Sequence, residues 1–240
     1  MMKQSIFKIK ENIALTDSIF KMVLLGDTSD LRTGQFVNIK LDGFFLRRPI
    51  SVCDVDKKSL TIIYKIVGEG TEQMSKMTAG EKLDLLTGLG NGYDLTLAGK
   101  KNLLVGGGVG IPPLYKLAKD LKGNCTVVLG FNTATEIFYE DEFKALGANV
   151  IITTIDGTKG VKGLATDVLK DIDYDYFFAC GPEPMLKAVY EQTKTSGQLS
   201  FEERMGCGFG ACMGCTCKTI TGYKRICVEG PVLVKEELVW

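Results

Sequence analysis

The sequence predicts a multidomain β plus α/β protein: an antiparallel β-barrel over residues 1–98, a doubly wound parallel sheet over residues 99–198, and a small domain over residues 199–240. Three observations predict this division. Short runs of alternating apolar and polar residues fill the first part, as in antiparallel strands with one buried face. Strands and helices then alternate, as in a parallel sheet. The last part is short and rich in cysteine, so we expect a metal to hold it together.

The composition describes a globular protein that lacks the features of a nucleic-acid or membrane protein. Of the 240 residues, 45% are hydrophobic and 24% are charged, and 29 basic residues balance 29 acidic ones. A balanced charge provides no basic surface for nucleic acid or anionic lipid. No apolar run approaches the roughly 18 residues of a membrane span, and the N-terminus leads into a strand pattern instead of a signal sequence. We therefore expect a cytoplasmic protein.

The first part contains strand patterns at intervals of about a dozen residues, which favours a barrel or sandwich. The clearest are Phe20–Leu25, Gln35–Leu41 and Leu60–Ile66, separated by turns rich in Gly, Asp and Ser. One helix is predicted over Thr71–Met77, with Thr71 as its N-cap.

Within the barrel, Arg48-Pro49-Ile50-Ser51 combines a guanidinium, a fixed turn and a hydroxyl. This combination suits a flavin nucleotide, because Arg48 can bind the pyrophosphate in fork geometry while Ser51 hydrogen-bonds the ring system. A second strand would lie beneath the ring and a helix N-terminus at the phosphates. The residues predicted there are Tyr64, Lys65, Ile66, Val67, Gly70 and Thr71. The alternative interpretation is a surface arginine pair, Arg47 and Arg48, beside an ordinary turn.

The second part shows four strand–helix alternations, which predict a parallel sheet with helices on both faces. The strands are predicted at Asn102–Val105, Thr126–Gly130, Val150–Thr154 and Tyr176–Ala179, and the helices at about 112–122, 136–146, 163–170 and 183–195.

Two glycine–proline turns follow the first and last of these strands. The first runs from Gly106 to Pro113 and includes Gly107, Gly108 and Gly110; the second is Cys180-Gly181-Pro182. Glycine lets a backbone approach a pyrophosphate, and proline suits the first helical turn. Open α/β sheets bind ligands at the carboxyl ends of their strands, so both turns predict a dinucleotide site. The first turn is not a strict G-x-G-x-x-G, and a turn without a ligand is the alternative.

The segment after the second strand, residues 131–142, bears on the choice of nucleotide. It contains Glu136, Glu140, Asp141 and Glu142 but no lysine or arginine. Because a 2′-phosphate would need a cation there, NAD is favoured over NADP.

Four cysteines near the C-terminus carry the strongest signal. Cys207, Cys212 and Cys215 follow the C-x4-C-x2-C pattern of plant-type [2Fe–2S] ligands, with Cys227 as the fourth. The last interval is shorter than in that type. A zinc site is an alternative, although it usually has two C-x2-C pairs, and disulfides are another. Cys217 could compete as a ligand. The other cysteines, Cys53, Cys125 and Cys180, are expected to be buried apolar thiols. The chain has no histidine, which excludes Rieske ligation.

In this order, Arg48–Ser51, Gly70-Thr71, Gly106–Pro113, Cys180–Pro182 and the cysteine loop resemble the ferredoxin-NADP⁺-reductase-like flavoproteins with an added iron–sulfur tail. The tail, Glu203–Cys215 and Cys227–Pro231, is most similar to the family of electron-transfer subunits of NAD-linked dihydroorotate dehydrogenases. The resemblance implies FAD on the barrel, NAD on the parallel sheet and a [2Fe–2S] cluster at the four cysteines. It also implies a heterotetramer, two of each subunit, with an FMN-containing catalytic subunit in pyrimidine (UMP) biosynthesis.

The implied electron path runs from dihydroorotate through the partner's FMN, the cluster and FAD to NAD⁺. A flavin belongs between the other two carriers because it exchanges both hydride and single electrons. No catalytic acid or base is expected in this chain. Two alternatives remain: a subunit of a ferredoxin- or sulfur-linked NAD(P)H oxidoreductase, and a non-catalytic redox-sensing module with a zinc-bound tail.

Overall fold

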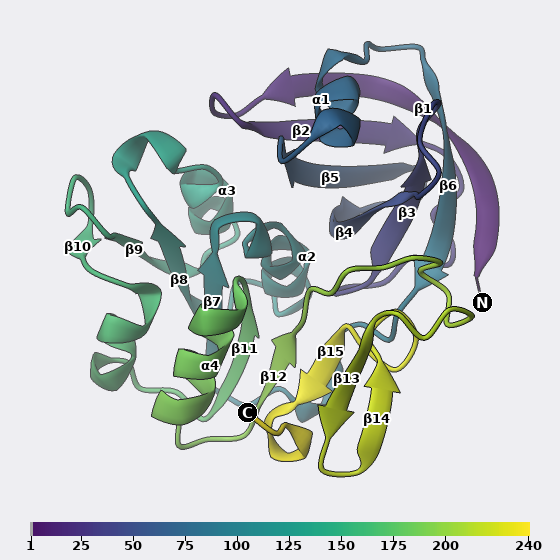
Figure 1. The fold of residues 1–240 in the computed structure, drawn as a ribbon. Helices are drawn as coiled ribbons and strands as arrows, with labels where there is room; N and C mark the ends of the chain where they lie inside the picture. Colours follow the sequence, from purple (N-terminus) through teal and green to yellow (C-terminus); the bar gives the residue numbers. More distant parts are fainter. Residues whose placement is uncertain (1) are drawn as a thin grey trace.

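The computed structural model describes residues 2–240, which form a barrel, a central sheet and a small C-terminal unit (Figure 1). Six strands close the barrel in the order β1-β2-β5-β4-β3-β6, and every neighbouring pair is antiparallel. The strands are β1 Lys3–Ala14, β2 Ile19–Leu25, β3 Phe36–Lys40, β4 Arg48–Val55, β5 Ser59–Lys65 and β6 Lys82–Leu89. The predicted barrel is confirmed.

Helix α1, Glu69–Lys76, begins earlier than predicted. Thr71 is not its N-cap: Gly68 occupies that position, and Thr71 lies in the first turn. The Thr71 hydroxyl accepts hydrogen bonds from the N–H groups of Val67 (2.9 Å) and Gly68 (3.3 Å). The threonine therefore fixes the helix start from inside the helix, where its hydroxyl still satisfies N–H groups that lack helical partners.

The central sheet has seven strands in the order β10-β9-β8-β7-β11-β12-β15, and only the β12–β15 pair is antiparallel. The strands are β7 Asn102–Gly107, β8 Cys125–Phe131, β9 Asn149–Thr154, β10 Val161–Lys162, β11 Tyr176–Cys180, β12 Gly197–Ser200 and β15 Val232–Val234. Leu104 of β7 packs with helices α2 (Pro112–Asp120) and α3 (Glu140–Ala145), whereas its neighbours pack with α4 (Glu183–Gln192) on the opposite face. The doubly wound arrangement is confirmed.

Two of the predicted helices differ in the structure. The segment predicted as a helix over 163–170 is a 3-10 helix, Ala165–Asp171, in which β-branched Thr166 and Val168 disfavour a regular α-helix. The helix predicted over 136–146 begins only at Glu140, because Tyr139 has a left-handed backbone conformation (φ 65°) that interrupts it.

The C-terminal unit is joined to the rest of the chain through a shared core. An antiparallel hairpin of β13 (Thr216–Thr219) and β14 (Gly222–Arg225) leads back to the central sheet, where β15 pairs with β12. The division expected at residues 198 and 199 therefore falls within β12. Cys215, Ile226, Cys227 and Leu233 pack in one apolar cluster with Phe36 of the barrel and Leu103 of the sheet. Apolar contacts as well as cysteine ligands can hold this unit in place.

The barrel and the sheet also meet directly. Ile19 and Ile63 of the barrel lie in one apolar cluster with Leu104 and Ile111 of the sheet domain. Helix α2 packs against β4, where the Lys119 ammonium contacts the Asp54 carboxylate at 2.7 Å. The strand that carries the flavin motif and the helix that follows the glycine turn are therefore packed together. Within residues 2–240, no helix is both long and apolar enough to cross a membrane.

Candidate cofactor sites

The four predicted cluster ligands lie together in the C-terminal unit. Cys207, Cys212 and Cys215 lie in the loop between β12 and β13, and Cys227 follows β14. Cys215 and Cys227 are each 2% exposed, Cys207 is half-buried and Cys212 is exposed. The site therefore has a buried side that faces the shared core and an accessible side that faces solvent.

The backbone of this loop turns its N–H groups toward sulfur. Cys207 Sγ accepts hydrogen bonds from the N–H groups of Phe209 (3.5 Å), Ala211 (3.2 Å) and Cys212 (3.4 Å). Burial opposes ionisation of Cys207, but these N–H groups outweigh it and lower the pKa of its thiol to about 6. Since a thiolate is the form that binds iron, the loop is prepared for a negatively charged ligand.

Two further hydrogen bonds arrange the four thiols in two pairs. The Cys207 N–H donates to Cys212 Sγ at 3.4 Å, and the Cys227 N–H donates to Cys215 Sγ at 3.4 Å. A [2Fe–2S] cluster needs two cysteines for each iron, so the residues present fit that group. Cys217 lies on β13 opposite Lys224 and outside this network. All eight cysteines are free in this structure.

Within the described residues 2–240, no group of three or more histidine, cysteine, aspartate or glutamate side chains is arranged so that it could hold a single metal ion.

A cavity of about 390 Å³ lies where the predicted flavin motif meets the start of α1. It is lined by Phe44, Arg48, Val67, Gly68, Glu69, Gly70 and Thr71. A Cβ on Gly70 would lie closer to the Arg48 guanidinium than van der Waals contact allows, so glycine is needed for that approach. Val67, at the rim of this cavity, is 79% exposed. The structure thus brings together Arg48, Val67, Gly70 and Thr71.

Pro49 and Ser51 follow Arg48 on β4, and both are half-buried. Lys65 ends β5, and Ile66 follows it with its N–H bonded to the Ser18 carbonyl at 2.9 Å. Ile50 is half-buried and packs against the barrel core.

Tyr64 is the flavin candidate whose side chain points elsewhere. Its ring is 2% exposed inside the barrel core and stacks on Phe20 with 5.9 Å between centroids. Its hydroxyl donates to Asn12 Oδ1 at 3.0 Å, and burial raises its pKa to about 12. The phenol ring of Tyr64 therefore points into the barrel core, and the place of its strand beneath a flavin ring stays a prediction.

The two glycine–proline turns lie side by side at the carboxyl edge of the sheet, because β7 and β11 are adjacent parallel strands with Gly106 opposite Cys180. A Cβ on Gly110 would overlap the Cys180 carbonyl, and one on Gly181 would overlap Met185. Gly108 has a left-handed backbone (φ 52°), which favours glycine. Pro112 and Pro113 open α2, as predicted. Burial raises the pKa of the Cys180 thiol to about 12, so this thiol is neutral at physiological pH.

Substitution Gly110→Ala is expected to separate the two turns. The added methyl meets backbone atoms of Cys180 and Gly181, which cannot rotate away. Overpacking of this kind costs roughly 1–3 kcal/mol, and we expect both a lower urea midpoint and weaker NADH binding. Gly147→Ala is the control for added backbone strain without overlap, because nothing lies within 4 Å of a Cβ there, whereas its backbone, unlike that of Gly110, is left-handed (φ 88°). Normal NADH affinity in Gly110→Ala would contradict a role of this turn in the site.

A lysine approaches the acidic segment from the loop between β9 and β10. The Glu140 carboxylate forms one ion pair with Lys144 Nζ at 2.6 Å and a second with Lys159, which lies between β9 and β10. A hydrogen bond also joins the segment after β8 to the loop between β9 and β10: the Ala134 N–H donates to Thr158 Oγ1 at 2.8 Å. The segment 131–142 itself contains no lysine or arginine, as the sequence indicated. The fold nevertheless brings the ammonium group of Lys159 next to this segment, where the Glu140 carboxylate pairs with it.

Substitution Glu140→Gln is therefore expected to shift nucleotide preference toward NADPH. Without the carboxylate, Lys144 and Lys159 keep free charge at the edge where a ribose phosphate would lie. An exposed pair is worth roughly 0.2–1 kcal/mol, so the ratio of kcat/KM for NADPH to that for NADH should rise about twofold to fivefold. The ratio is measured by NAD(P)H-driven dye reduction. Glu72→Gln, which frees Lys76 on the barrel, is the control and should leave it unchanged.

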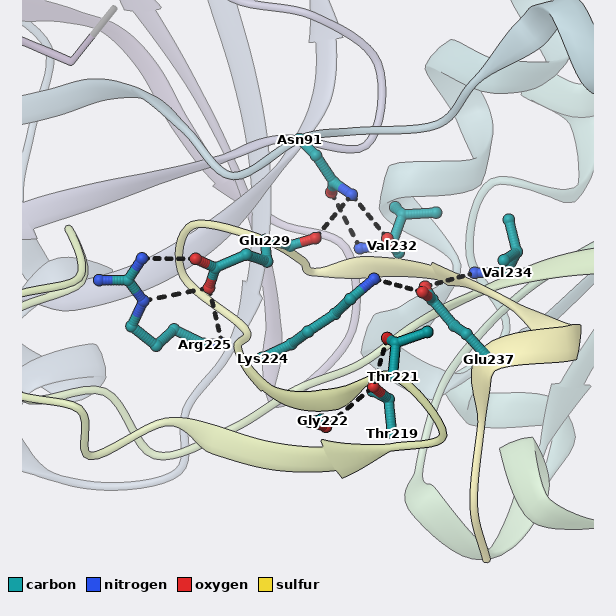
Figure 2. A network of polar contacts seen from close by, with 10 residues as sticks. All are labelled: Asn91, Thr219, Thr221, Gly222, Lys224, Arg225, Glu229, Val232, Val234 and Glu237. Atoms are coloured by element: carbon teal, nitrogen blue, oxygen red, sulfur yellow. Dashed lines mark hydrogen bonds and ion pairs between the residues drawn. The ribbon is translucent and has the colours of Figure 1, made fainter.

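Side chains that the sequence did not single out hold the C-terminal unit in place (Figure 2). The Asn91 amide donates to the carbonyls of Glu229 (3.0 Å) and Val232 (2.6 Å) and accepts from the Val232 N–H (3.1 Å). Arg225 pairs with Glu229 and also donates to the Gly210 carbonyl at 2.9 Å. On the barrel side, Asn38 Nδ2 donates to the Cys207 carbonyl at 3.2 Å. A single asparagine or arginine has no sequence pattern that would have revealed these contacts.

Known proteins resemble this chain along its whole length. Residues 202–239 match the iron-sulfur cluster binding domain of dihydroorotate dehydrogenase B. The electron transfer subunit of dihydroorotate dehydrogenase B (NAD(+)) from Fusobacterium nucleatum is 44% identical, with 96% of each chain covered. That from Bacillus pumilus is 42% identical, covering 99% of this chain and 98% of the relative.

This chain belongs to the family of dihydroorotate dehydrogenase B electron transfer subunits.

Solved structures share the fold of this chain. A chain of the NADH-dependent reduced ferredoxin-NADP oxidoreductase has a TM-score of 0.87 and 30% identity, covering 98% of this chain and 90% of its own length. A ferredoxin NADP⁺ reductase from Neisseria gonorrhoeae with bound FAD and NADP has a TM-score of 0.68 at 18% identity, over 79% of this chain and 89% of its own, which supports the fold alone. The family resemblance inferred from the motifs is confirmed, and an iron–sulfur tail is favoured over zinc.

Proposed function

We propose that this chain is the electron transfer subunit of an NAD-dependent dihydroorotate dehydrogenase, with FAD and one [2Fe–2S] cluster as cofactors and NAD⁺ as the electron acceptor. The observation that carries this proposal is the paired set of cysteine thiols with N–H groups directed at sulfur, found in one chain with a flavin motif and a dinucleotide edge. Its family consists of electron transfer subunits.

In this proposal, Cys207, Cys212, Cys215 and Cys227 ligate the iron. The N–H groups of Phe209, Ala211, Cys212 and Gly214 donate to the outer pair of thiolates. Hydrogen bonds to sulfur stabilise its negative charge and so help to set the reduction potential. When bound, the flavin exchanges hydride with a nicotinamide and single electrons with an iron–sulfur cluster.

FAD is held along β4 and at the start of α1. The Arg48 guanidinium donates to the pyrophosphate, and the Ser51 hydroxyl to the ring system. Pro49 and Ile50 fix the strand between them. The backbone of Lys65, Ile66 and Val67 borders the ring, and Gly70 with Thr71 presents the first helical N–H groups of α1 to phosphate.

NAD⁺ binds across the two glycine–proline turns. Gly106, Gly107, Gly108 and Gly110 let the backbone approach the pyrophosphate, and Cys180, Gly181 and Pro182 form the neighbouring wall. A hydride transfer needs no protein acid or base, and the Cys180 thiol stays protonated at neutral pH. This part of the chain therefore acts by placing the two reacting rings.

The partner is a dihydroorotate dehydrogenase catalytic subunit with FMN, two copies of each subunit forming a heterotetramer in the cytoplasm. The complex serves pyrimidine (UMP) biosynthesis. The chain has a net charge of zero, so we expect neither nucleic acid nor a membrane as a partner. The three-part division at about residues 98 and 198 belongs to the same proposal.

The chain purified under anaerobic conditions tests the cofactors. We expect about two irons and two acid-labile sulfides per chain, bound FAD, and bleaching of the visible spectrum by NADH. Co-expression with the catalytic subunit should give dihydroorotate-dependent reduction of NAD⁺. A colourless protein with stoichiometric zinc would refute the proposal.

A second candidate function is supported by the similarity to the reduced ferredoxin-NADP oxidoreductase, at 30% identity over 98% of this chain. In that case the chain would be a subunit of a ferredoxin- or sulfur-linked NAD(P)H oxidoreductase. Replacing dihydroorotate by reduced ferredoxin in the same assay separates the two, because only one donor should reduce NAD⁺.

A further inference from the structure

Asn38 lies on the outer face of the barrel, between the flavin strand and the cluster loop. Its neighbours on β3, Val37 and Ile39, point into the barrel core. Successive side chains of a strand alternate between faces, so Asn38 and Phe36 point outward, and Phe36 packs with the core of the C-terminal unit. Asn38 is nevertheless only 1% exposed, because the cluster loop covers it.

On one side, Asn38 holds the cluster loop. Its Nδ2 donates to the carbonyl of the ligand Cys207 at 3.2 Å. The next residue, Gly208, has a left-handed backbone (φ 78°), and a Cβ there would overlap Asn38 Nδ2. Only glycine permits this close approach, so loop and asparagine are matched to each other.

On the other side, Asn38 borders the flavin motif. In the β3–β4 ladder, Asn38 is directly opposite Pro49 and Phe36 is opposite Ser51. Residues opposite each other in antiparallel strands share a face, and their diagonal neighbours are roughly 7–8 Å apart. Asn38 and Ser51 are diagonal neighbours, so the residue that contacts the cluster loop shares a face with the hydroxyl assigned to the flavin ring.

The amide oxygen of Asn38 is unused by the chain. Asn38 Oδ1 is buried and has no hydrogen-bond partner among residues 2–240. A buried acceptor without a donor is destabilising, and such groups in native proteins call for an explanation. A donor from a bound cofactor would satisfy it, and flavins carry ring N–H and ribityl hydroxyl groups.

We propose that Asn38 is a positioning residue that joins the two cofactor sites: its Nδ2–H fixes the cluster loop through the Cys207 carbonyl, while its Oδ1 accepts a hydrogen bond from the flavin bound at Arg48–Ser51. The inference rests on the proposed function. Asn38 itself takes no electron and no proton. It sets the separation between the two carriers, on which single-electron transfer depends steeply.

Three variants of the full-length protein test this role. Asn38→Ala removes both bonds. Gly208→Ala crowds the loop against Asn38 Nδ2 but keeps the Oδ1 acceptor. Asn91→Ala removes the other asparagine that holds the C-terminal unit, by three hydrogen bonds to Glu229 and Val232 that involve neither the cluster loop nor the flavin motif, and is the control for a purely structural effect. For each variant we would measure iron and sulfide content, the EPR spectrum of the dithionite-reduced protein, and FAD affinity by fluorescence titration.

We expect Asn38→Ala to shift the g values of the reduced cluster and to weaken FAD binding about threefold to tenfold, as for the loss of one neutral hydrogen bond. Gly208→Ala should shift the g values but keep the FAD affinity. Asn91→Ala should change neither, even where it lowers the melting temperature. If Asn38→Ala does not fold, the EPR spectrum of Gly208→Ala tests the contact between Asn38 and the cluster loop. Asn38→Asp, which keeps an acceptor at this position, then tests the hydrogen bond to the flavin, because its FAD affinity should be retained.

The outcomes separate this inference from the proposed function. A wild-type protein without iron, sulfide and FAD would refute both. A wild-type protein that holds both cofactors, with unchanged g values and FAD affinity in Asn38→Ala, would refute the role of Asn38 alone. Equal changes in Asn38→Ala and Asn91→Ala would assign the effect to general loosening of the C-terminal unit and would also overturn it.

Discussion

Replacing Cys227 with serine is expected to abolish the iron–sulfur cluster and to destabilise the C-terminal unit. Cys227 is 2% exposed and packs in the core that the C-terminal unit shares with the barrel and the sheet. Its N–H donates to Cys215 Sγ, so the two buried thiols act as a pair. Binding of a metal that no unfolded chain would hold contributes directly to folding. Loss of the cluster therefore removes both the electron carrier and part of the stability.

The expected result is a fall in iron from about two atoms per chain to near zero. A loss of roughly 2–3 kcal/mol would lower the melting temperature by about 5–10 °C for a chain of this size. Bound FAD should remain, because its motif lies on the barrel. The measurements are colorimetric iron and sulfide, the EPR signal after reduction, and a thermal melt.

Cys217→Ser is the matched control. Cys217 is two residues from Cys215, is half-buried on β13, and donates and accepts nothing within the loop network. It should keep the full iron content and the wild-type spectrum. If Cys217→Ser lost its iron while Cys227→Ser retained it, the ligand set proposed here would be wrong.

The parts of the fold that the sequence predicts well are those with a local cause. The period-two pattern of the barrel strands and the strand–helix alternation of the sheet depend on neighbours in sequence, and both architectures are confirmed. The predicted first residues of the helices were less accurate. Gly68 caps α1 while Thr71 bonds back from within it, and a left-handed Tyr139 delays α3. Such choices depend on single backbone angles, which composition does not fix.

The candidate sites divide in the same way. Contiguous motifs such as Arg48–Ser51 and the cysteine loop are visible because one short segment carries several required residues. Asn38 and Cys207 are 169 residues apart, and their contact depends on which barrel strand lies under the loop. Tyr64 shows the same limit, since its sequence context does not reveal that its ring points into the barrel core. Long-range pairing therefore sets the limit of prediction from the sequence.

Replacing Arg48 with alanine is expected to weaken FAD binding about tenfold to hundredfold without unfolding the barrel. The Arg48 guanidinium lines the cavity beside Gly70 and lies 4.6 Å from the Phe44 ring centroid. Among residues 2–240 it hydrogen-bonds only to the nearby Leu46 carbonyl (2.6 Å). It therefore contributes little to the fold and is free for a ligand. A hydrogen bond to a charged group is worth roughly 1.5–3 kcal/mol, and each 1.4 kcal/mol is tenfold in affinity. Fluorescence titration of the deflavinated protein with FAD measures the change.

The adjacent arginine provides the control, because the same side chain performs a different task one residue away. Arg47 Nη1 donates to the Asp84 carboxylate (3.0 Å), the Asp84 carbonyl (3.0 Å) and the Asn38 carbonyl (3.3 Å), and so joins β3, β4 and β6. Arg47→Ala leaves these largely buried acceptors unpaired and should cost roughly 1–3 kcal/mol of unfolding free energy in urea, with FAD affinity nearly unchanged. Arg48→Ala should show the opposite pattern. An equal loss of FAD affinity in both variants would mean that the flavin responds to barrel stability, and Arg48 would then lose its assigned role at the pyrophosphate.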